Sequence, residues 1–192
     1  MNDFELLSIK NFFDANTCGE LITEMRRLPS TAALTYAADE IGSVDNRTRK
    51  VARVEPSPHT VGFVMDRLIQ HRQEIGDYFG VELNDCENPQ FLRYRVGDFF
   101  VAHQDGNTGM VRLQSDQLRR VSASIFLNDQ SEQPEPDKYC GGSLVFHDCR
   151  NARSRSIAGE SGTLLAFRSE TTHEVVPVTF GERYSIVAWY RI

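Results

Sequence analysis

The sequence predicts a mainly β protein with flanking α-helices, built as a jelly roll or a barrel-like sandwich. Apolar residues recur at helical spacing early in the chain, but they alternate with polar residues from residue 89 onward. The alternating segments are short and are separated by clusters of glycine, proline, aspartate or asparagine. No helical pattern lies between them, which predicts antiparallel strands. We expect strands at residues 90–96, 99–104, 120–128, 142–147, 162–168, 173–179 and 183–191.

The first expected helix lies in the segment NTCGELITEMRRLP, residues 16–29. Its apolar side chains recur at helical spacing and form one face. Thr17 is followed three residues later by Glu20, which is the pattern of a capping box. Pro29 follows the last expected turn and favours an end to the helix there.

A second helix is expected to begin at Ser57, because a serine N-cap followed by Pro58 is typical of a helix start. Gly80 is a favourable residue for its end. Between the two helices, residues 50–55 alternate like a strand, and residues 34–48 are expected to form a loop.

The 192 residues fit one domain, with residues 1–88 as a helical support region and residues 89–192 as a jelly-roll core. The composition, 40% apolar and 25% charged, is ordinary for a soluble globular protein. A net charge of −6 argues against nucleic acid as the main partner. No apolar run reaches the roughly 18 residues that a membrane span needs. The oligomeric state does not follow from these features.

The cysteines are spaced unlike a zinc site, since none belongs to a C-x-x-C pair. They are Cys18, Cys86, Cys140 and Cys149. We expect reduced, mostly structural thiols. The N-terminal segment MNDFELLSIKNFF has no basic region before an apolar run and therefore does not resemble a signal peptide. These features predict a cytoplasmic protein.

The stretch RYRVGDFFVAHQDGN, residues 93–107, is unusual for a buried strand because it ends in His103 and Asp105. These two residues have the same parity, so their side chains leave the same face of a strand. A buried carboxylate needs a partner, and His173 opens a later strand pattern. Two imidazoles and one carboxylate form the facial triad that holds non-heme Fe(II). An H-x-D pair alone is weak evidence, because it also occurs by chance.

A possible anion site follows ten residues after this histidine. Arg183 and Ser185 share one face of the last expected strand with Val187 and Trp189. A guanidinium fork next to a hydroxyl is a suitable receptor for a carboxylate. The alternative for an arginine on a final strand is a surface ion pair. The ordered set of both histidines, the aspartate, the arginine and the serine favours a functional site.

The second half of the chain resembles the Fe(II)/2-oxoglutarate-dependent dioxygenases, and among them the prolyl 4-hydroxylase-like branch. The resemblance covers roughly residues 89–192 in order, while the first half is only compatible with it. Four segments carry it: FLRYRVGDFFVAHQDGN, RRVSASIFLND, CGGSLVFHD and GESGTLLAFRSETTHEVVPVTFGERYSIVAWY. The fold that this resemblance implies is a double-stranded β-helix, which is a variant of the jelly roll.

The resemblance implies that His103, Asp105 and His173 hold Fe(II), with 2-oxoglutarate and O2 as cosubstrates. Arg183 would bind the distal carboxylate of 2-oxoglutarate, and Ser185 would assist it. The implied reaction is oxidative decarboxylation of 2-oxoglutarate to succinate and CO2, coupled to hydroxylation of a C–H bond. An intact H-x-D argues for hydroxylation, because halogenating relatives replace this carboxylate.

Some positions depart from the pattern or have two readings. Related prolyl hydroxylases can carry a tyrosine that reaches the distal carboxylate where this chain has Phe126. Ser185 or Ser124 is the candidate to compensate for it. Tyr94 is a candidate to hydrogen-bond the cosubstrate, with a barrel aromatic as the alternative. Collagen-type enzymes use lysine at the position of Arg183, so this chain resembles them less.

The substrate is the least constrained part of the prediction. Residues 106–120 form a polar segment suited to a substrate loop or lid, in which Arg119 and Arg120 are candidate substrate contacts. Trp189 either lines the pocket or packs in the core. His147 is expected to have a strand-end or loop role and not to bind metal. The resemblance favours a prolyl or other residue in a protein or peptide, with a free amino acid or small metabolite as the alternative. A non-catalytic, cupin-like metal-binding module is a further alternative, which Arg183 and Ser185 argue against.

Overall fold

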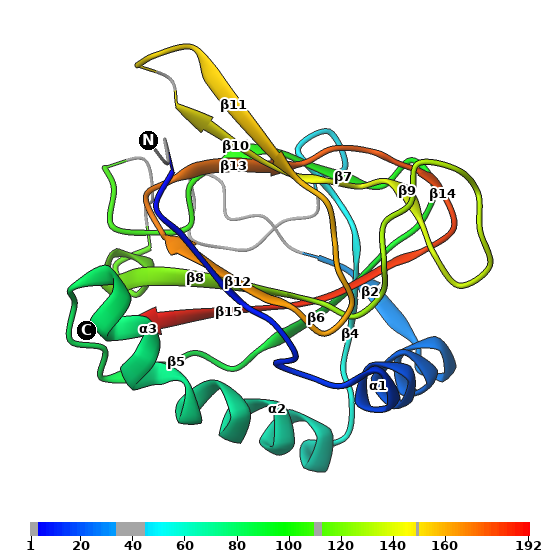
Figure 1. Ribbon diagram of the computed structural model, residues 1–192, viewed down its shortest axis with the longest axis horizontal. Coiled ribbons are helices and arrows are strands. Elements are labelled where there is room, and N and C mark those ends of the chain that lie inside the picture. The colour runs from blue at the N-terminus through cyan, green and yellow to red at the C-terminus, as the bar shows by residue number, and fades with distance from the viewer. Residues whose placement is uncertain (1–3, 34–44, 110–112, 149) are drawn as a thin grey trace.

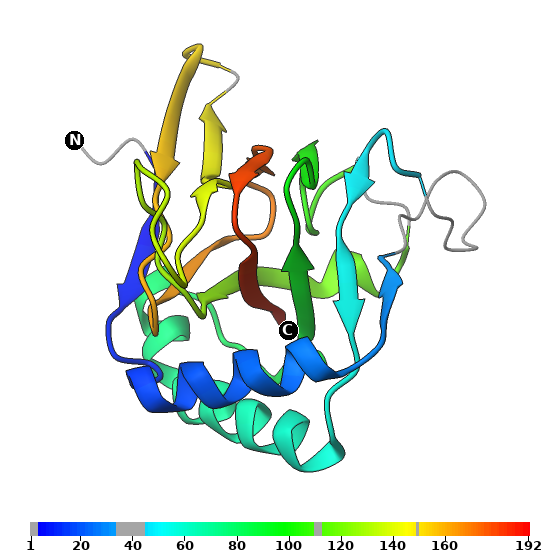
Figure 2. The same ribbon diagram turned by 90° about the vertical axis from the view of Figure 1, so that its right-hand side faces the viewer.

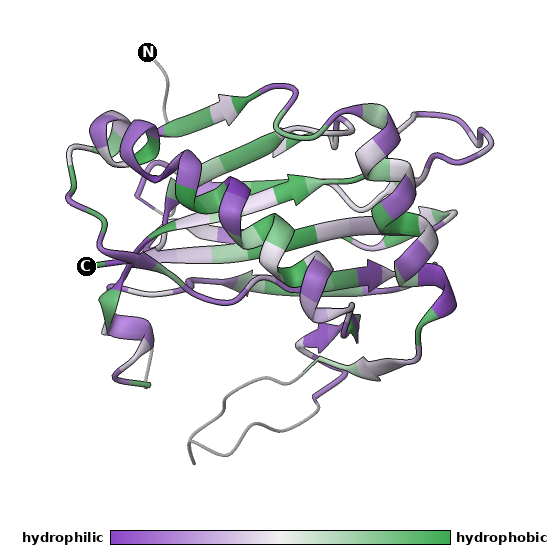
Figure 3. Cartoon of the chain, turned by 90° about the horizontal axis from the view of Figure 1, so that it is seen from below, coloured by the Kyte–Doolittle hydropathy of each residue, from purple (hydrophilic) through white to green (hydrophobic). Residues whose placement is uncertain are grey.

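The computed structural model describes residues 4–33, 45–109, 113–148 and 150–192. Two β-sheets lie one above the other, and the helices lie outside the larger sheet (Figure 1). Seen from the helical side, the helices cross over the strands of that sheet (Figure 3). Every pair of adjacent strands in the sheets is antiparallel, as the sequence predicts.

The larger sheet forms the floor of the barrel next to the helices. Its strands are β1 (Leu6–Ile9), β2 (Ser30–Ala32), β4 (Ala52–Val54), β5 (Asp85–Cys86), β6 (Gln90–Tyr94), β8 (Arg119–Phe126), β12 (Leu164–Arg168) and β15 (Arg183–Arg191). They lie in the order β1-β12-β8-β15-β6-β4-β2, and β5 pairs with β15. The strand β15, near the middle of this sheet, is therefore flanked by β8 and β6.

The smaller sheet faces the larger one and carries the order β11-β10-β13-β7-β3. Its strands are β3 (Arg49–Lys50), β7 (Phe99–His103), β10 (Leu144–Asp148), β11 (Arg153–Ile157) and β13 (Thr172–Val175). A separate pair is formed by β9 (Cys140–Gly141) and β14 (Val178–Phe180). Figure 2 shows the hairpin of β10 and β11 projecting beyond the rest of the sheets.

The first helix, α1 (Ala15–Arg27), begins earlier than the sequence predicts. Its N-cap is Asp14, whose Oδ1 accepts a hydrogen bond from the backbone N–H of Thr17 at 2.7 Å. The predicted capping box of Thr17 and Glu20 is therefore wrong. The aspartate one turn earlier already supplies the acceptor that the first backbone N–H groups need.

The second predicted helix is divided into α2 (Pro58–Gln70) and α3 (Arg72–Phe79). Ser57 is the N-cap of α2, and its side chain accepts from the backbone N–H of Thr60, as expected. Gly80 ends α3 in the left-handed conformation at φ 62°, which confirms the predicted end. A short 3₁₀ helix, η1 (Asp116–Leu118), precedes β8.

Two apolar cores lie on the two faces of the larger sheet. The alternation of β15 divides its side chains between them: Tyr184, Ile186, Ala188 and Tyr190 belong to the core under the helices. The second core lies between the sheets and includes Leu92, Tyr94, Phe126, Phe146 and Phe167. The odd-numbered residues of β15 face this second core, which is where the functional candidates are expected.

The predicted strands agree with the structure, except that their ends differ and that two of them are each divided into two strands. Residues 50–55 contain the end of β3 and all of β4, and residues 173–179 contain most of β13 and the start of β14. Pro177 lies in the second break and has no N–H for a sheet. The short strands β1, β2, β5 and β9 and the exposed, polar β11 were not predicted.

Among the described residues, no helix is long and apolar enough to cross a membrane. The cysteines within the described part of the chain, Cys18, Cys86 and Cys140, are free, and Cys149 lies outside it. The predicted loop at residues 34–48 falls largely outside the described residues.

Candidate active site

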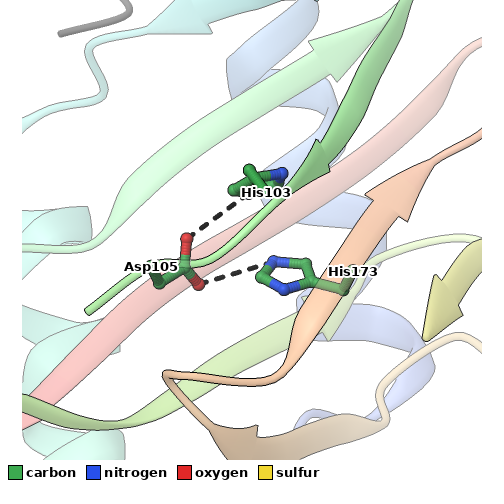
Figure 4. A group of neighbouring side chains, drawn as sticks. All are labelled: His103, Asp105 and His173. Atoms are coloured by element: carbon green, nitrogen blue, oxygen red, sulfur yellow. Dashed lines mark ion pairs between the residues drawn. The ribbon is translucent and has the colours of Figure 1, made fainter. Parts of the chain in front are cut away.

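The two predicted histidines and the aspartate meet at one end of the smaller sheet (Figure 4). His103 ends β7, and His173 lies opposite it on the neighbouring strand β13. Asp105 lies two residues after the end of β7, and its backbone N–H donates to the carbonyl of Ser169 at 2.9 Å. The candidate ligand atoms of these three side chains all lie within 4.8 Å of one another. The partly buried Asp105 is therefore accompanied by both histidines.

Both imidazole rings are held by the backbone two residues before them. Nδ1 of His103 lies 2.8 Å from the carbonyl oxygen of Val101, and Nδ1 of His173 lies 2.9 Å from that of Thr171. A carbonyl can only accept, so each Nδ1 carries a proton, and Nε2 is the ring nitrogen that faces Asp105. The two Nε2 atoms lie 3.4 and 3.5 Å from the carboxylate oxygens of Asp105.

Asp105 is ionised in this environment. Burial raises the pKa of its carboxyl group, but the neighbouring histidines and the Ser122 hydroxyl more than reverse this effect and hold the pKa well below its usual range. Ser122 also shares a hydrogen bond of 3.0 Å with the hydroxyl of Ser169. Ser122 thus links the carboxylate to β8 and helps to fix its orientation.

His173 is neutral at pH 7. Burial and the neighbouring His103 lower the pKa of His173 to about 4, although Asp105 opposes this shift. The Nε2 atoms of both histidines and the carboxylate oxygens of Asp105 face one another and can bind one cation together. Two nitrogens and one oxygen on neighbouring positions are the donor set of a non-heme Fe(II) centre. The residues present therefore fit Fe(II).

Arg183 lies in the barrel interior at the start of β15 and is only 1% exposed. Its Nη1 donates to the hydroxyl of Ser185 at 3.0 Å, and its guanidinium lies over the ring of Tyr94 at 4.8 Å and the ring of Phe126 at 5.6 Å. No carboxylate of the described residues pairs with it, and its buried Nε has no hydrogen-bond partner there. A buried guanidinium with only neutral neighbours is suited to an anionic ligand.

The other cosubstrate candidates surround this arginine. Tyr94 is directly opposite Arg183 on β6, and Phe126 is opposite Ser185 on β8. Ser124 is buried two residues before Phe126, on the same face of β8. The structure therefore places the side chains of Tyr94, Ser185 and Ser124 in the sheet region around Arg183, and their contact with a cosubstrate stays a prediction.

Arg119, a candidate substrate contact, is held by acidic neighbours. Its guanidinium forms two hydrogen bonds of 2.7 Å with the carboxylate of Glu87, pairs with Asp116 at 3.1 Å and donates to the backbone carbonyl of Asp105 at 3.1 Å. It also lies 4.1 Å from the ring centre of Trp189. These contacts place Arg119 beside the metal cluster.

The neighbouring candidates make fewer contacts. The guanidinium of Arg120 donates to the backbone carbonyls of Gln117 and Arg119. Trp189 is opposite Ser122, and its buried Nε1 has no hydrogen-bond partner among the described residues. Part of the predicted lid, residues 110–112, lies outside the described chain.

His147 lies apart from the metal cluster. Its Nε2 lies 3.0 Å from a carboxylate oxygen of Glu174. The adjacent Phe146 faces the barrel interior, so His147 points to the other face of β10. His147 therefore faces away from the metal cluster, and the consecutive residues His147 and Asp148 leave opposite faces of the strand.

A family model described as the 2OG-Fe(II) oxygenase superfamily matches residues 89–191, which is more than half of the chain. The chain belongs to the 2OG-Fe(II) oxygenase superfamily. This confirms the resemblance inferred from the H-x-D, histidine and arginine pattern. A PKHD-type hydroxylase of Shewanella sp. (strain MR-7) is 31% identical over 152 residues, covering 78% of this chain and 62% of the relative. The chain spans about half to three fifths of the length of the curated relatives it matches.

Solved structures of this superfamily share the fold. A prolyl-4-hydroxylase of Pseudomonas putida has a TM-score of 0.73 at 24% identity, covering 98% of this chain and 93% of that chain. A prolyl hydroxylase of Trichoplax adhaerens, in complex with a peptide fragment of the hypoxia inducible factor oxygen degradation domain, has a TM-score of 0.75 at 20% identity, covering 99% and 84%. The likeness confirms the predicted jelly roll of the double-stranded β-helix type.

Sequence reasoning missed three residues near the site. Ser122 could have been found, because it precedes Ser124 and Phe126 at the spacing of one strand face. Glu87 is 32 residues from Arg119 in the chain, and no local pattern pairs them. Tyr139 ends an acidic loop, and nothing in that segment indicates that its side chain is buried.

Proposed function

We propose that this chain is an Fe(II)- and 2-oxoglutarate-dependent dioxygenase that hydroxylates a C–H bond of a prolyl or other residue in a protein or peptide. The observation that carries the proposal is that one barrel contains both a set of metal ligands and a receptor for an anion. The cluster of His103, Asp105 and His173 offers a facial set of metal ligands. The buried Arg183 has no carboxylate partner among the described residues and offers an anion receptor.

The residues would have separate roles in this reaction. His103, Asp105 and His173 would hold Fe(II), which supplies the chemistry that activates O2. Arg183 and Ser185 would bind the distal carboxylate of 2-oxoglutarate, and Tyr94 would contact the cosubstrate. One oxygen atom of O2 would enter the hydroxylated product and the other succinate, with release of CO2. The protein binds and orients the reactants and limits the access of water.

A peptide substrate is favoured by the named relatives and neighbours. The solved structures include prolyl hydroxylases, one of them in complex with a peptide fragment, and the curated relatives are PKHD-type hydroxylases. The metal cluster is also reachable from solvent, since the side chains of His103 and Asp105 are 19% and 12% exposed. Arg119 contacts the backbone of Asp105 and lies over Trp189, so these two residues would be near a substrate at the cluster, and Arg120 follows Arg119 in the chain.

The test is product formation by the purified protein with Fe(II) and 2-oxoglutarate under air. Succinate is measured by NMR, and prolyl peptides and free amino acids are examined by mass spectrometry for the gain of one oxygen atom. We expect succinate in both cases and the added oxygen in peptides. Hydroxylation of free amino acids alone would favour the small-molecule alternative. Absence of succinate would favour a non-catalytic metal-binding module.

A further inference from the structure

Tyr139 is a fully buried tyrosine whose hydroxyl has no hydrogen-bond partner among the described residues. It ends the long loop between β8 and β9, and its backbone is fixed at both polar groups. Its N–H donates to the carbonyl of Asp129 at 3.2 Å, and its carbonyl accepts from the N–H of Ser131 at 2.8 Å. These two hydrogen bonds fix the backbone of Tyr139, while its hydroxyl oxygen has no hydrogen-bond partner among the described residues. Such an atom is costly to bury unless a ligand uses it.

Two glycines leave the space that the Tyr139 ring occupies. A methyl group at Gly142 would lie 3.2 Å from Cε2 of Tyr139 and 3.2 Å from Cδ of Arg183, so Tyr139 and Arg183 flank the same point. A methyl group at Gly159 would lie 2.1 Å from the Tyr139 hydroxyl and 3.1 Å from Cδ1 of Phe126. The hydroxyl thus lies beside Phe126, whose ring is itself under the guanidinium of Arg183.

The groups that meet here are hydrogen-bond donors. Burial raises the pKa of the Tyr139 hydroxyl, although the charge and the N–H groups of Arg183 and the backbone N–H of Gly159, which face the hydroxyl oxygen, oppose this shift. The hydroxyl therefore keeps its proton at pH 7, and this proton has no acceptor among the described residues. The buried Nε–H of Arg183 is also unpaired. Two unpaired donors next to a positive charge require an acceptor that carries negative charge. Phe126 cannot supply one, and Ser185 already accepts from Nη1 of Arg183.

We propose that Tyr139 is a specificity residue that donates its hydroxyl to the distal carboxylate of 2-oxoglutarate held by Arg183. This inference rests on the proposed function and deepens it. It adds Tyr139 to Arg183 and Ser185 as a donor to this carboxylate, so that Tyr139 compensates for the phenylalanine at position 126. The hydroxyl selects 2-oxo acids with a second carboxylate over those that end in a methyl group.

The experiment compares Tyr139→Phe with the wild type in the presence of Mn(II), which occupies the metal site without supporting turnover. Calorimetry measures the affinity for 2-oxoglutarate and for 2-oxopentanoate, which has the same carbon chain but no distal carboxylate. We expect Tyr139→Phe to bind 2-oxoglutarate about tenfold more weakly, because a hydrogen bond to a charged group is lost. Its affinity for 2-oxopentanoate should not change. The thermal midpoint of the free protein should not fall, because the deleted hydroxyl has no protein partner.

Tyr190→Phe is the matched control. Tyr190 is equally buried, but it belongs to the core under the helices, and its hydroxyl donates to the carbonyl of Leu68 at 2.9 Å. We expect this variant to lose stability and to keep its affinity for 2-oxoglutarate. The proposal is overturned if Tyr139→Phe binds 2-oxoglutarate like the wild type, or if both ligands weaken equally. A wild-type protein that does not bind 2-oxoglutarate would instead refute the proposed function, and this assignment with it.

Discussion

Replacing Arg183 by methionine should strongly weaken cosubstrate binding without destabilising the free protein. Methionine keeps the length of the side chain and removes the charge. In a protein where Arg183 served the fold, the same change would break a stabilising ion pair. Here the guanidinium is buried, and its described hydrogen bond is to the hydroxyl of Ser185.

The expected change in the free energy of unfolding follows from the contacts of the Arg183 guanidinium. The hydrogen bond to a neutral hydroxyl contributes about 1 kcal/mol, and the rings of Tyr94 and Phe126 contribute about 1 kcal/mol each. The desolvation of a buried ion costs several kcal/mol. Arg183→Met should therefore change the free energy of unfolding of the free protein by between about 0 and +3 kcal/mol. Binding of 2-oxoglutarate should weaken by about 30-fold or more, since truncating one partner of a buried charge pair costs roughly 2–5 kcal/mol.

Urea unfolding of the metal-free protein measures the first quantity, and calorimetry with Mn(II) and 2-oxoglutarate measures the second. Arg93→Met is the matched control. Arg93 is also buried, on the adjacent strand β6, but it alternates with Tyr94 and donates to the hydroxyl of Ser30. It should keep its affinity for 2-oxoglutarate. A large loss of stability in Arg183→Met together with unchanged 2-oxoglutarate affinity would show that the arginine serves the fold and would refute the reasoning.

Other predictions concern the metal and its surroundings. Alanine at any residue of the metal cluster should abolish succinate formation in a folded protein, whereas His147→Ala should keep most activity; an active cluster variant would remove that ligand from the assignment. Ser122→Ala should weaken Mn(II) binding about tenfold by calorimetry, because the hydroxyl orients the carboxylate; unchanged affinity would make this contact incidental. Arg119→Ala should lower the free energy of unfolding by about 2 kcal/mol in urea, because two partly buried carboxylates lose their partner, and Arg120→Ala should lower it less. If Arg119→Ala kept its stability and lost only substrate oxidation, the arginine would act on the substrate.

The spacing of apolar residues, together with the alternation of odd and even positions along each strand, was sufficient to predict most of the barrel. The strand β15 was predicted at its observed bounds, and its alternation placed Arg183 and Trp189 on the interior side. The smaller elements were missed for physical reasons. The strand β11 is polar and exposed, and its pairing with β10 comes from the hairpin and not from burial. The break at His71 between α2 and α3 carries neither proline nor glycine and gives no local signal.

The metal cluster could be predicted because metal chemistry restricts residue types strongly. The residues around the cluster, such as Glu87, could not be predicted, because only the fold brings them close to the residues that they contact. The capping prediction for α1 failed for a local reason: two residues could serve as N-cap, and Asp14 begins the helix first. The loop that ends in Tyr139 lies between two predicted strands, but burial of its last residue depends on Gly142 and Gly159, which come later in the chain.

The polar groups of the site that lack partners in the free protein predict how its ligands stabilise the protein. Among the described residues, the metal cluster brings three candidate ligand side chains together, Arg183 has no carboxylate partner, and the Tyr139 hydroxyl has no hydrogen-bond partner. A bound metal ion and a bound dicarboxylate would supply these missing partners. A ligand at 100 times its dissociation constant adds about 2.7 kcal/mol to the free energy of unfolding. For a chain of this length, that raises the thermal midpoint by about 5–10 °C. Mn(II) and 2-oxoglutarate should therefore each raise the midpoint of the wild type. In Arg183→Met only Mn(II) should do so, and stabilisation of that variant by 2-oxoglutarate would place the anion receptor elsewhere.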